Sequence, residues 1–584
     1  MAKTPLFASL RRIYQGVAAR RTDGTAAPVA ASAARPTRRD VLRASASFAA
    51  LIPAGAAASL VGCGDDTEPP PDAPTEIAIV GGGIAGLHCA YRLRQAGIDS
   101  VIYEATDRAG GRMWTGRNLF DTNLNQICEI GGELIDTGHT TLHALADEFD
   151  LILDDRTADL PVDFETDTYF VNDVKVPIDT VTQQFVAVAS VFQDAVMAAD
   201  SDETAFATLD STTLEQWLLD NVPKGTYPEL HAVLRNAYRN EFGLETDQQS
   251  ALNLIYLIGS DDPDPFRIFG ISDERYHTHL GNDSFPTKLY EQLDPEAVLF
   301  EHRLVAIEDT TGGYSLTFDT PTGQTVRRAA RVVFALPFTI LREVDTTNLT
   351  LSDEKRNIID ELGYGTNAKV MIGFDRRVWK LDYNAAGSII TDLPVQQTWD
   401  TTVGQVGNEG ILTNFLGGAQ GVASGTGTAL EWAQNVLNDI ELIYPGATIA
   451  FTNEVVRQHW PSVDTVKGSY ACYKPGQWSF FGLEGKREGN LHFCGEHCSQ
   501  DWQGYMEGGA ETGALVAAEI IDDLGMNQPQ GLIKALGPKL VIPQACYRAD
   551  RWAKLTPFER RRVARAEMQR LLDSAQAQQP PARP

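Results

Sequence analysis

The sequence has few basic residues for its length. Its 584 residues include 49 lysines and arginines against 78 aspartates and glutamates, which gives a formal net charge of −29 at pH 7. Proteins bind nucleic acid largely through positively charged side chains that contact the anionic phosphates. This charge balance therefore argues against nucleic acid as a partner. The same negative charge favours solubility and is compatible with a cationic substrate.

Cysteine is scarce as well, with 7 residues. Cys494 and Cys498 have no second cysteine pair or histidine cluster at zinc spacing, so we predict no metal site. Once Cys63 is assigned to a lipid, as argued below, six cysteines remain, an even number that permits disulfides. We expect free buried thiols instead, because Cys89 falls on the buried face of a predicted helix.

The sequence also lacks a long apolar run near its start. Ala44–Leu60 is only mildly apolar and is interrupted by proline, which makes it a poor membrane span. It follows Thr37–Arg43 (TRRDVLR), which resembles a twin-arginine export signal, and ends at Leu60–Cys63 (LVGC), which resembles a bacterial lipobox. We therefore expect residues 1–63 to direct export by the twin-arginine route and Cys63 to carry a lipid anchor at the bacterial cell envelope, the chain's sole membrane contact.

A dinucleotide-binding unit follows a linker rich in proline and aspartate, residues 64–75. The apolar run at 77–80 predicts a buried strand, and Glu104 ends a second strand after a predicted helix. Between the strand and the helix, glycines in the G-x-G-x-x-G spacing occupy Gly81, Gly83 and Gly86. Such glycines let the backbone approach a pyrophosphate at a helix N-terminus, and an acid at position 104 can accept both ribose hydroxyls.

The stretch that begins at Glu104 resembles a loop of the flavin amine oxidase family, which includes monoamine, polyamine and L-amino-acid oxidases. It has the form E-A-x-x-R-x-G-G-R and contains Arg108, Gly111 and Arg112. Glycines permit close backbone approach, and the guanidinium groups can neutralise a diphosphate. The resemblance, which covers about six separated motifs between residues 76 and 525, implies FAD as the cofactor.

Further cofactor contacts are implied by the resemblance. Val305 matches a position whose backbone meets the adenine, and Gly495 and Glu496 match a pair whose acid meets the ribityl chain. Met506 lies at the start of a long predicted helix. The N-terminus of that helix would stabilise negative charge on reduced flavin. Mammalian monoamine oxidases have a flavin-bonding cysteine where this chain has Ser469, so non-covalent FAD is implied.

The resemblance also implies the reacting groups. Lys369 lies in an apolar predicted strand, where burial is costly unless something accepts its protons. The family's matching lysine holds a water against flavin N5; the alternative is a lysine on a sheet edge that reaches solvent. Tyr470 and Tyr505 match the two rings of the family's aromatic cage, while Trp502 is either a third wall or a core residue.

Glu133 is a candidate substrate-pocket residue, either facing a cationic group or lying solvated or paired with arginine. One branch of amino-acid oxidases places an arginine for the substrate carboxylate where this chain has Leu134, so that form of carboxylate recognition is in doubt. Amines and L-amino acids both remain candidate substrates. The sequence leaves open whether the chain forms a homodimer.

The fold implied is α/β, with a Rossmann-like FAD-binding domain and an interleaved α+β substrate domain. The implied boundaries are 76–137 with 281–340 and 485–525 for the FAD domain, 138–280 with 341–484 for the substrate domain, and 526–584 for a C-terminal extension. The implied reaction moves hydride from the α-carbon of a primary amine or L-amino acid to flavin N5, reduces O₂ to H₂O₂, and yields an imine that hydrolyses to a carbonyl compound and ammonia. A polyamine oxidase, or another flavoprotein oxidoreductase or desaturase of this fold, is the alternative.

The export signal can be tested by substitution. Arg38→Lys with Arg39→Lys should leave the precursor in the cytoplasm, because the twin guanidinium groups are what the export route recognises. Cys63→Ser should give an unlipidated and unprocessed precursor, because the serine offers no thiol for acylation. Cell fractionation with immunoblotting measures both. Unchanged cleavage and membrane association of the Cys63→Ser form would replace the lipoprotein with a soluble exported enzyme.

Overall fold

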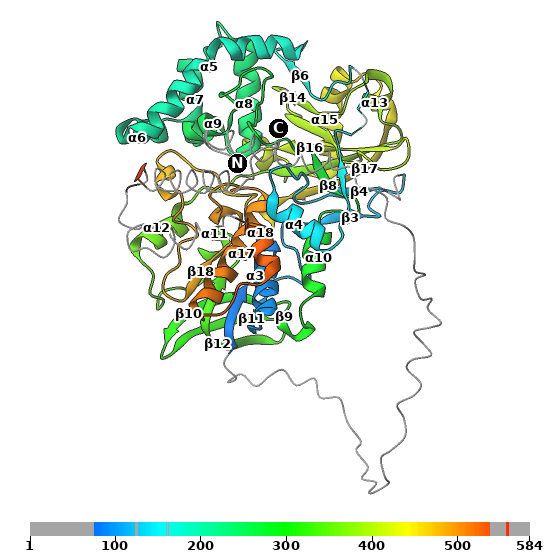
Figure 1. Cartoon of the computed structure of the whole chain (residues 1–584). Helices are drawn as coiled ribbons and strands as arrows, with labels where there is room; N and C mark the ends of the chain where they lie inside the picture. The colour runs from blue at the N-terminus through cyan, green and yellow to red at the C-terminus, as the bar shows by residue number, and fades with distance from the viewer. Residues whose placement is uncertain are drawn as a thin grey trace, which may run out of the picture.

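The computed structural model describes residues 75–122, 126–158, 160–161, 163–537, 556 and 558–559. The predicted export signal with Cys63, residues 64–74 of the linker and nearly all of the chain beyond residue 537 lie outside these ranges. The described part consists of two sheets with their covering helices, one below the other in Figure 1. The α/β fold class predicted from the sequence is confirmed.

The first sheet is the nucleotide-type sheet predicted around the glycine motif. Its strands run in the order β10-β11-β12-β1-β2-β9, with β18 beside β12. β1 pairs in parallel with β2 and β12, whereas β10, β11 and β12 form an antiparallel meander. The strands are β1 (Thr75–Val80), β2 (Val101–Tyr103), β9 (Val298–Leu299), β10 (Arg303–Thr310), β11 (Gly313–Thr320), β12 (Gly323–Phe334) and β18 (Leu491–Phe493).

Helices α3 (Ile84–Gln95) and α17 (Met506–Asp523) pack closely against each other beside this sheet. Small residues in α17 make the approach feasible: a Cβ at Gly513 would lie 2.1 Å from the carbonyl oxygen of Ala85. The N-termini of both helices lie at the cavity described below. The neighbouring helices are α4 (Thr140–Glu148), α10 (Ser284–Glu291) and α18 (Gln530–Leu536).

The second sheet is mixed and runs in the order β17-β13-β16-β15-β14-β6-β7. Its second strand, β13 (Ala368–Phe374), is buried along its whole length and pairs antiparallel with a strand on each side. Lys369 therefore does not lie on a sheet edge, and that alternative is wrong. The other strands are β6 (Thr168–Val171), β7 (Val174–Val176), β14 (Ile389–Thr391), β15 (Gln397–Asp400), β16 (Gly410–Leu416) and β17 (Phe451–His459).

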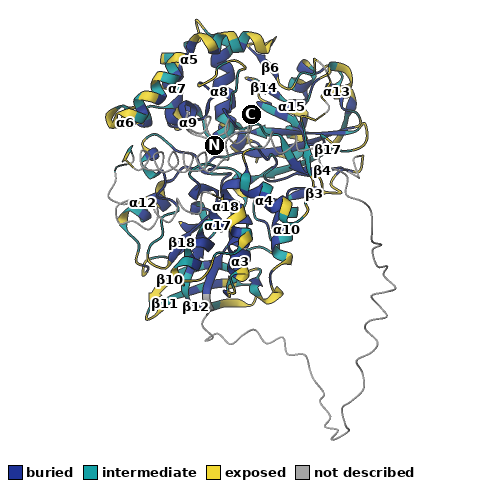
Figure 2. Ribbon diagram, in the orientation of Figure 1, coloured by how far each residue is buried: buried dark blue, intermediate teal, exposed yellow. Residues whose placement is uncertain are grey.

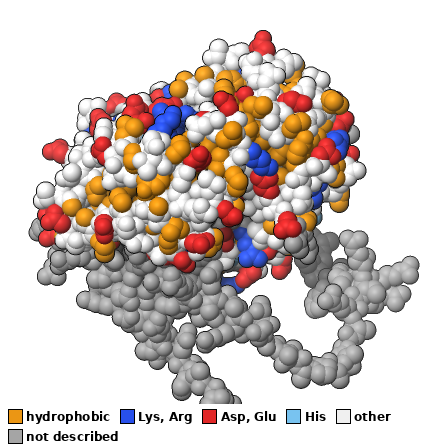
Figure 3. Space-filling view, turned by 90° about the horizontal axis from the view of Figure 1, so that it is seen from above, with side chains coloured by type: hydrophobic (Ala, Val, Ile, Leu, Met, Phe, Trp, Pro, Cys, Tyr) orange, Lys and Arg blue, Asp and Glu red, His pale blue; other side chains and the backbone are white. Residues whose placement is uncertain are grey.

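Helices cover the second sheet on both of its faces. Their inner faces are buried and their outer faces exposed, as Figure 2 shows. In the view from above, hydrophobic and acidic side chains are interspersed over the surface (Figure 3). These helices are α5 (Ile178–Ser201), α6 (Glu203–Ser211), α7 (Leu214–Asn221), α8 (Pro228–Phe242), α9 (Ala251–Leu257), α13 (Val378–Tyr383) and α15 (Ala429–Ile443).

Short elements connect the two bodies. Two small antiparallel pairs, β3 (Thr115–Arg117) with β4 (Ile127–Glu129) and β5 (Leu153–Asp155) with β8 (Tyr276–Thr278), lie where the chain passes from one body to the other. The remaining α-helices are α11 (Phe338–Leu341), α12 (Asp353–Glu361), α14 (Gly418–Ala423) and α16 (Ala447–Ala450). Among the described residues, no helix combines the length and the apolar character needed to cross a bilayer. The five cysteines in these ranges are buried.

Candidate active site

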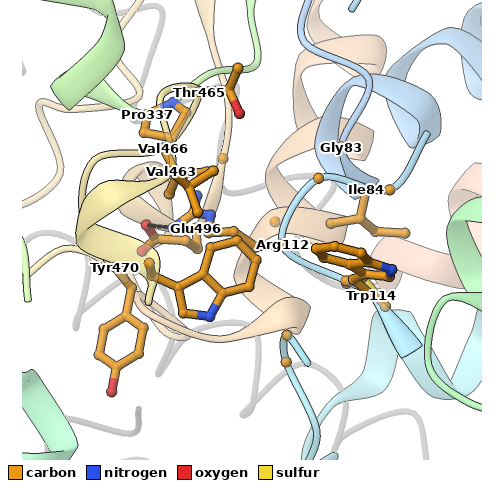
Figure 4. Close-up of a pocket in the computed structure, with 18 of the residues that line it drawn as sticks. Gly83, Ile84, Arg112, Trp114, Pro337, Val463, Thr465, Val466, Tyr470 and Glu496 are labelled. Atoms are coloured by element: carbon orange, nitrogen blue, oxygen red, sulfur yellow. Dashed lines mark hydrogen bonds and ion pairs between the residues drawn. The ribbon is translucent and has the colours of Figure 1, made fainter. Parts of the chain in front are cut away.

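Residues of both bodies line a cavity of about 640 Å³. It brings together most of the residues singled out in the sequence, from the glycine motif to the two tyrosines. In Figure 4, Gly83, Ile84 and Trp114 lie on one side of it, and Tyr470 and Glu496 lie on the other. Of the predicted site residues, three do not line it: Gly86, Val305 and Trp502.

The three motif glycines have two different tasks. A Cβ at Gly86 would lie 2.0 Å from the carbonyl oxygen of Gly81, and one at Gly81 would lie 2.5 Å from that of Ala335, so these two glycines allow backbone to pack on backbone. A Cβ at Gly83 would meet no protein atom within 4 Å. Gly83 therefore borders open space at the start of α3, whose first turn has no side-chain cap and no acidic residue. Free backbone N–H groups beside open space fit a pyrophosphate.

Glu104 is fixed at the end of β2. Its Oε2 accepts a hydrogen bond from the Gly82 N–H at 2.6 Å, and its Oε1 accepts from the Thr106 N–H and hydroxyl at 2.9 and 2.7 Å. Because a carboxylate offers about four acceptor positions, one is left toward the cavity that Glu104 lines. The arrangement fits the ribose contact expected of this residue.

Arg112 and Glu496 form a buried connection between distant segments. The Arg112 Nη1 donates to Glu496 Oε1 at 2.8 Å and to the Ser469 carbonyl at 2.7 Å. The other oxygen of Glu496 accepts from the Gly504 N–H at 2.9 Å. Figure 4 shows Arg112 directed across the cavity toward Glu496. Arg108 instead stacks on Trp114, with its guanidinium carbon 4.4 Å from the ring centroid.

The adenine end differs slightly from the prediction. Cavity-lining residues there are His302, Arg303 and Leu304, whereas Val305 lies one position beyond them. The Val305 carbonyl instead accepts from the Asp345 N–H at 2.9 Å, which ties β10 to a neighbouring segment. The pairing of β10 with β11 is irregular at this residue, between Leu304 and Ala306.

Lys369 has a partner that the sequence did not predict. Its ammonium donates to Glu133 Oε2 at 2.8 Å and to the carbonyls of Gly131 and Glu129 at 2.8 and 3.1 Å. An ammonium has three N–H donors, which matches the number of these protein acceptors. Burial would raise the pKa of Glu133, but the charge of Lys369 outweighs it and holds that pKa below its ordinary value.

Glu133 therefore lines the cavity, yet its carboxylate serves Lys369. Its partner is a lysine, neither the substrate cation nor the arginine considered from the sequence. The lysine also lies 5.3 Å from the centroid of the Trp399 ring. Trp399 and Phe415, which sequence analysis missed, line the cavity from β15 and β16.

Tyr470 and Tyr505 line the cavity and both bind one residue, Glu241. The Tyr470 hydroxyl donates to the Glu241 backbone carbonyl at 2.7 Å, and the Tyr505 hydroxyl donates to the Glu241 carboxylate at 3.0 Å. Burial holds the pKa of both tyrosines well above the ordinary value, so both hydroxyls stay protonated. Trp502 lies behind Tyr505 and contacts His139 at a ring distance of 4.5 Å. It is therefore the core residue of the two alternatives.

The ring end of the cavity is acidic. Glu241 and Glu274 both line it. Asp136 lies beside Glu274, whose backbone N–H donates to Asp136 Oδ1 at 2.7 Å. Burial raises the pKa of these acids to about 7 for Glu241, 8 for Glu274 and 6 for Asp136. The lining residues that carry positive charge are Arg108, Arg112, Arg303 and the paired Lys369.

Sequence analysis could not identify the acidic groups. Glu241 ends a helix and Glu274 lies in a loop, and neither belongs to a recognisable motif. No group of three or more metal-ligating side chains occurs in the described ranges. At the opposite wall, the N-terminus of α17 adjoins the cavity at Met506, while Glu507 is turned away and accepts from the Thr141 and Leu142 N–H groups.

Comparisons with known proteins agree with this geometry. The profile of the family described as flavin containing amine oxidoreductase matches residues 84–521. An L-amino acid dehydrogenase of Synechocystis sp. is 25% identical over 77% of this chain and 96% of its own, and an L-amino-acid oxidase of Crotalus adamanteus is 21% identical over 76% and 87%. The structure of cyclohexylamine oxidase from Brevibacterium oxydans IH-35A superposes with a TM-score of 0.66 at 20% identity, covering 78% of this chain and 100% of that one.

Two alanine substitutions in the glycine motif should separate flavin binding from folding. Gly83→Ala should fold normally but lose bound flavin, because its Cβ meets only the open space beside α3. Gly86→Ala should fold poorly, because its Cβ would collide with the Gly81 carbonyl. Circular dichroism measures folding, and absorbance near 450 nm measures flavin per chain after purification. Wild-type flavin content in Gly83→Ala would refute the assignment of this space to the cofactor.

Lys369→Met should destabilise the protein by about 3–5 kcal/mol, because it leaves Glu133 buried without its cation. The double variant Lys369→Met with Glu133→Gln should recover much of this loss. Arg376→Met is the control: it breaks an ion pair with Asp382 whose side chains are 42% and 40% exposed, and it should change the unfolding midpoint far less than Lys369→Met does. Urea unfolding midpoints measure all three, and equal losses in the single and double variants would contradict the pairing.

Proposed function

The chain belongs to the flavin-containing amine oxidoreductase family, and from this premise we propose that it oxidises primary amines with non-covalently bound FAD and O₂ as the acceptor. The observation that supports an amine substrate is the distribution of charge in the cavity. Its ring end is bordered by Glu241, Glu274 and the C-terminal carbonyls of α8, all of which attract a cation. Two positively charged lining residues lie near the rings, and each is paired with a carboxylate: Lys369 with Glu133 and Arg112 with Glu496.

The residues that would hold FAD line the cavity on both of its sides. Gly83 and the N-terminus of α3 fit the pyrophosphate, Glu104 fits the ribose, and Arg112 and Glu496 lie along the path to the rings. When bound, FAD supplies the acceptor for a hydride from the amine α-carbon and passes two electrons to O₂, giving H₂O₂. The non-covalent mode is supported by Ser469, whose hydroxyl donates to Asn367 Oδ1 at 2.6 Å and offers no thiol.

The protein's own groups have separate tasks in this proposal. The acidic ring end draws the ammonium form of the amine out of water, and Glu241 or Glu274 can hold its proton, since burial brings the pKa of both close to neutrality, about 7 and 8. Tyr470 and Tyr505 then confine the neutral amine between their rings. The imine product hydrolyses to a carbonyl compound and ammonia.

L-Amino acids are the second candidate substrates, favoured by the names of the relatives in Synechocystis and Crotalus. An amino acid carries a carboxylate, which needs a cation in the cavity. Leu134 stands where one branch of amino-acid oxidases has its arginine, and the lining arginines are engaged elsewhere: Arg112 pairs with Glu496, Arg303 pairs with Glu343, and Arg108 stacks on Trp114. The cavity therefore favours the amine.

We also propose export and lipid anchoring, which rest on residues 1–63 alone. A twin-arginine route carries folded proteins, so FAD would be bound before export. The acidic linker would hold the enzyme away from the membrane surface.

A matched substrate pair tests the function. n-Pentylamine and L-norleucine differ only in the α-carboxylate, and the amine should show a kcat/KM at least about tenfold higher in a peroxide-release assay, a difference of about 1.4 kcal/mol. Faster turnover of L-norleucine would favour the second candidate. Anaerobic bleaching of the flavin without peroxide in air would indicate another electron acceptor. Bleaching by neither compound, across longer and shorter homologues, would refute the proposal.

A further inference from the structure

The two rings of the cavity are bound by one residue through two bonds of different kinds. Tyr470 donates to the backbone carbonyl of Glu241, and Tyr505 donates to its side chain. Tyr470 lies between β17 and β18, Tyr505 immediately precedes α17, and Glu241 is the penultimate residue of α8. A single helix end thus contacts both rings.

We propose that Glu241 is a positioning residue that sets the two rings independently, Tyr470 through its fixed backbone carbonyl and Tyr505 through its ionisable carboxylate. This inference rests on the proposed function, for which the rings confine the amine. It assigns the distance between the rings to one side chain: a change at position 241 moves Tyr505 and leaves Tyr470 in place.

The backbone half of the arrangement is rigid. The last carbonyls of a helix have no partner within it, so the Glu241 carbonyl is free to accept from Tyr470. The helix end is held by its neighbours: the Asn240 carbonyl accepts from the Asn367 side chain at 2.7 Å, and the Gly243 carbonyl accepts from the Thr366 N–H at 2.8 Å. Gly243 has a φ of 71°, and a Cβ there would lie 2.0 Å from Asn367 Oδ1.

The side-chain half responds to charge. The groups facing the Glu241 carboxylate are Tyr505, which donates to it, and the acids Asp136 and Glu274, which repel its charge. Burial raises the pKa of Glu241 to about 7, so its carboxylate is partly protonated at pH values where an ordinary glutamate is ionised. Protonation removes the charge that strengthens the bond from Tyr505.

A double-mutant cycle separates the two bonds. Glu241→Ala and Tyr505→Phe should each lower kcat/KM for n-pentylamine about tenfold, and the double variant should lose no more than either, because both remove the same bond. Glu241→Ala with Tyr470→Phe should instead show the product of the single effects, because the backbone carbonyl remains. Multiplied effects in the Glu241–Tyr505 cycle would overturn the inference.

The conservative variant Glu241→Gln supplies a second test that does not depend on folding of the alanine form. Its amide oxygen still accepts from Tyr505, so Glu241→Gln should lose clearly less kcat/KM at pH 8 than Glu241→Ala does. The wild-type KM should rise as the pH falls through about 7, and this rise should be absent from Glu241→Gln. The amine titrates equally in both proteins, so the difference between the profiles reports Glu241. Coincident profiles would overturn the inference.

The cycle can also be measured without substrate. In urea unfolding midpoints, Glu241→Ala should be non-additive with Tyr505→Phe and additive with Tyr470→Phe. Glu274→Gln, which removes a carboxylate from the same wall, should be additive with Tyr505→Phe. A wild type that oxidises no amine would refute the proposed function, and the unfolding cycle would still decide the role of Glu241.

Discussion

The ion pair between Arg112 and Glu496 is the contact on which the site depends. It joins the loop after β2 to the segment that leads into α17, and the same two side chains bind the Ser469 carbonyl and the Gly504 N–H. Ser469 continues the connection, because its hydroxyl bonds to Asn367, whose amide bonds to the Asn240 carbonyl at the end of α8. Hydrogen bonds thus run from the nucleotide sheet to the helix end that holds both tyrosines. Breaking the pair would leave a buried charge and loosen both walls at once.

Charge is sorted along the cavity. Guanidinium groups line the nucleotide end beside Glu104 and Asp107, and they would neutralise a diphosphate there, whereas the carboxylates of Glu241 and Glu274 border the ring end, where an amine would arrive. Lys369 and Glu133 lie between these ends and cancel each other at 2.8 Å. Opposite charges at opposite ends bind two ligands of opposite sign without attracting each to the wrong place. The pair in the middle allows a lysine to be buried in β13 without adding positive charge beside the amine.

The sequence predicted those parts of the site that lie close together along the chain. Strand, glycines, helix and Glu104 belong to one local unit whose geometry follows from spacing, and the resemblance added Tyr470 and Tyr505 from short motifs. Glu241, Glu274 and Trp399 were missed because their places in the cavity depend on how α8, a loop and β15 meet in three dimensions. The partner of Lys369 was missed for the same reason, since residues 133 and 369 are far apart in the sequence and meet only when β13 packs against the segment after β4. Trp502 adjoins a cage residue in sequence, yet it turns into the core.

The buried acids at the ring end are unfavourable for the empty protein. Burial raises the pKa of Asp136, Glu241 and Glu274, which means that ionising them inside the cavity costs free energy. A cation entering the cavity favours their ionised forms, so its binding is linked to release of protons from these groups. A carboxylate with a pKa near neutrality is also well matched to take the proton of an ammonium, whereas one at its ordinary value would hold that proton too weakly. The acids therefore suit a ligand that arrives charged and must become neutral before it reacts.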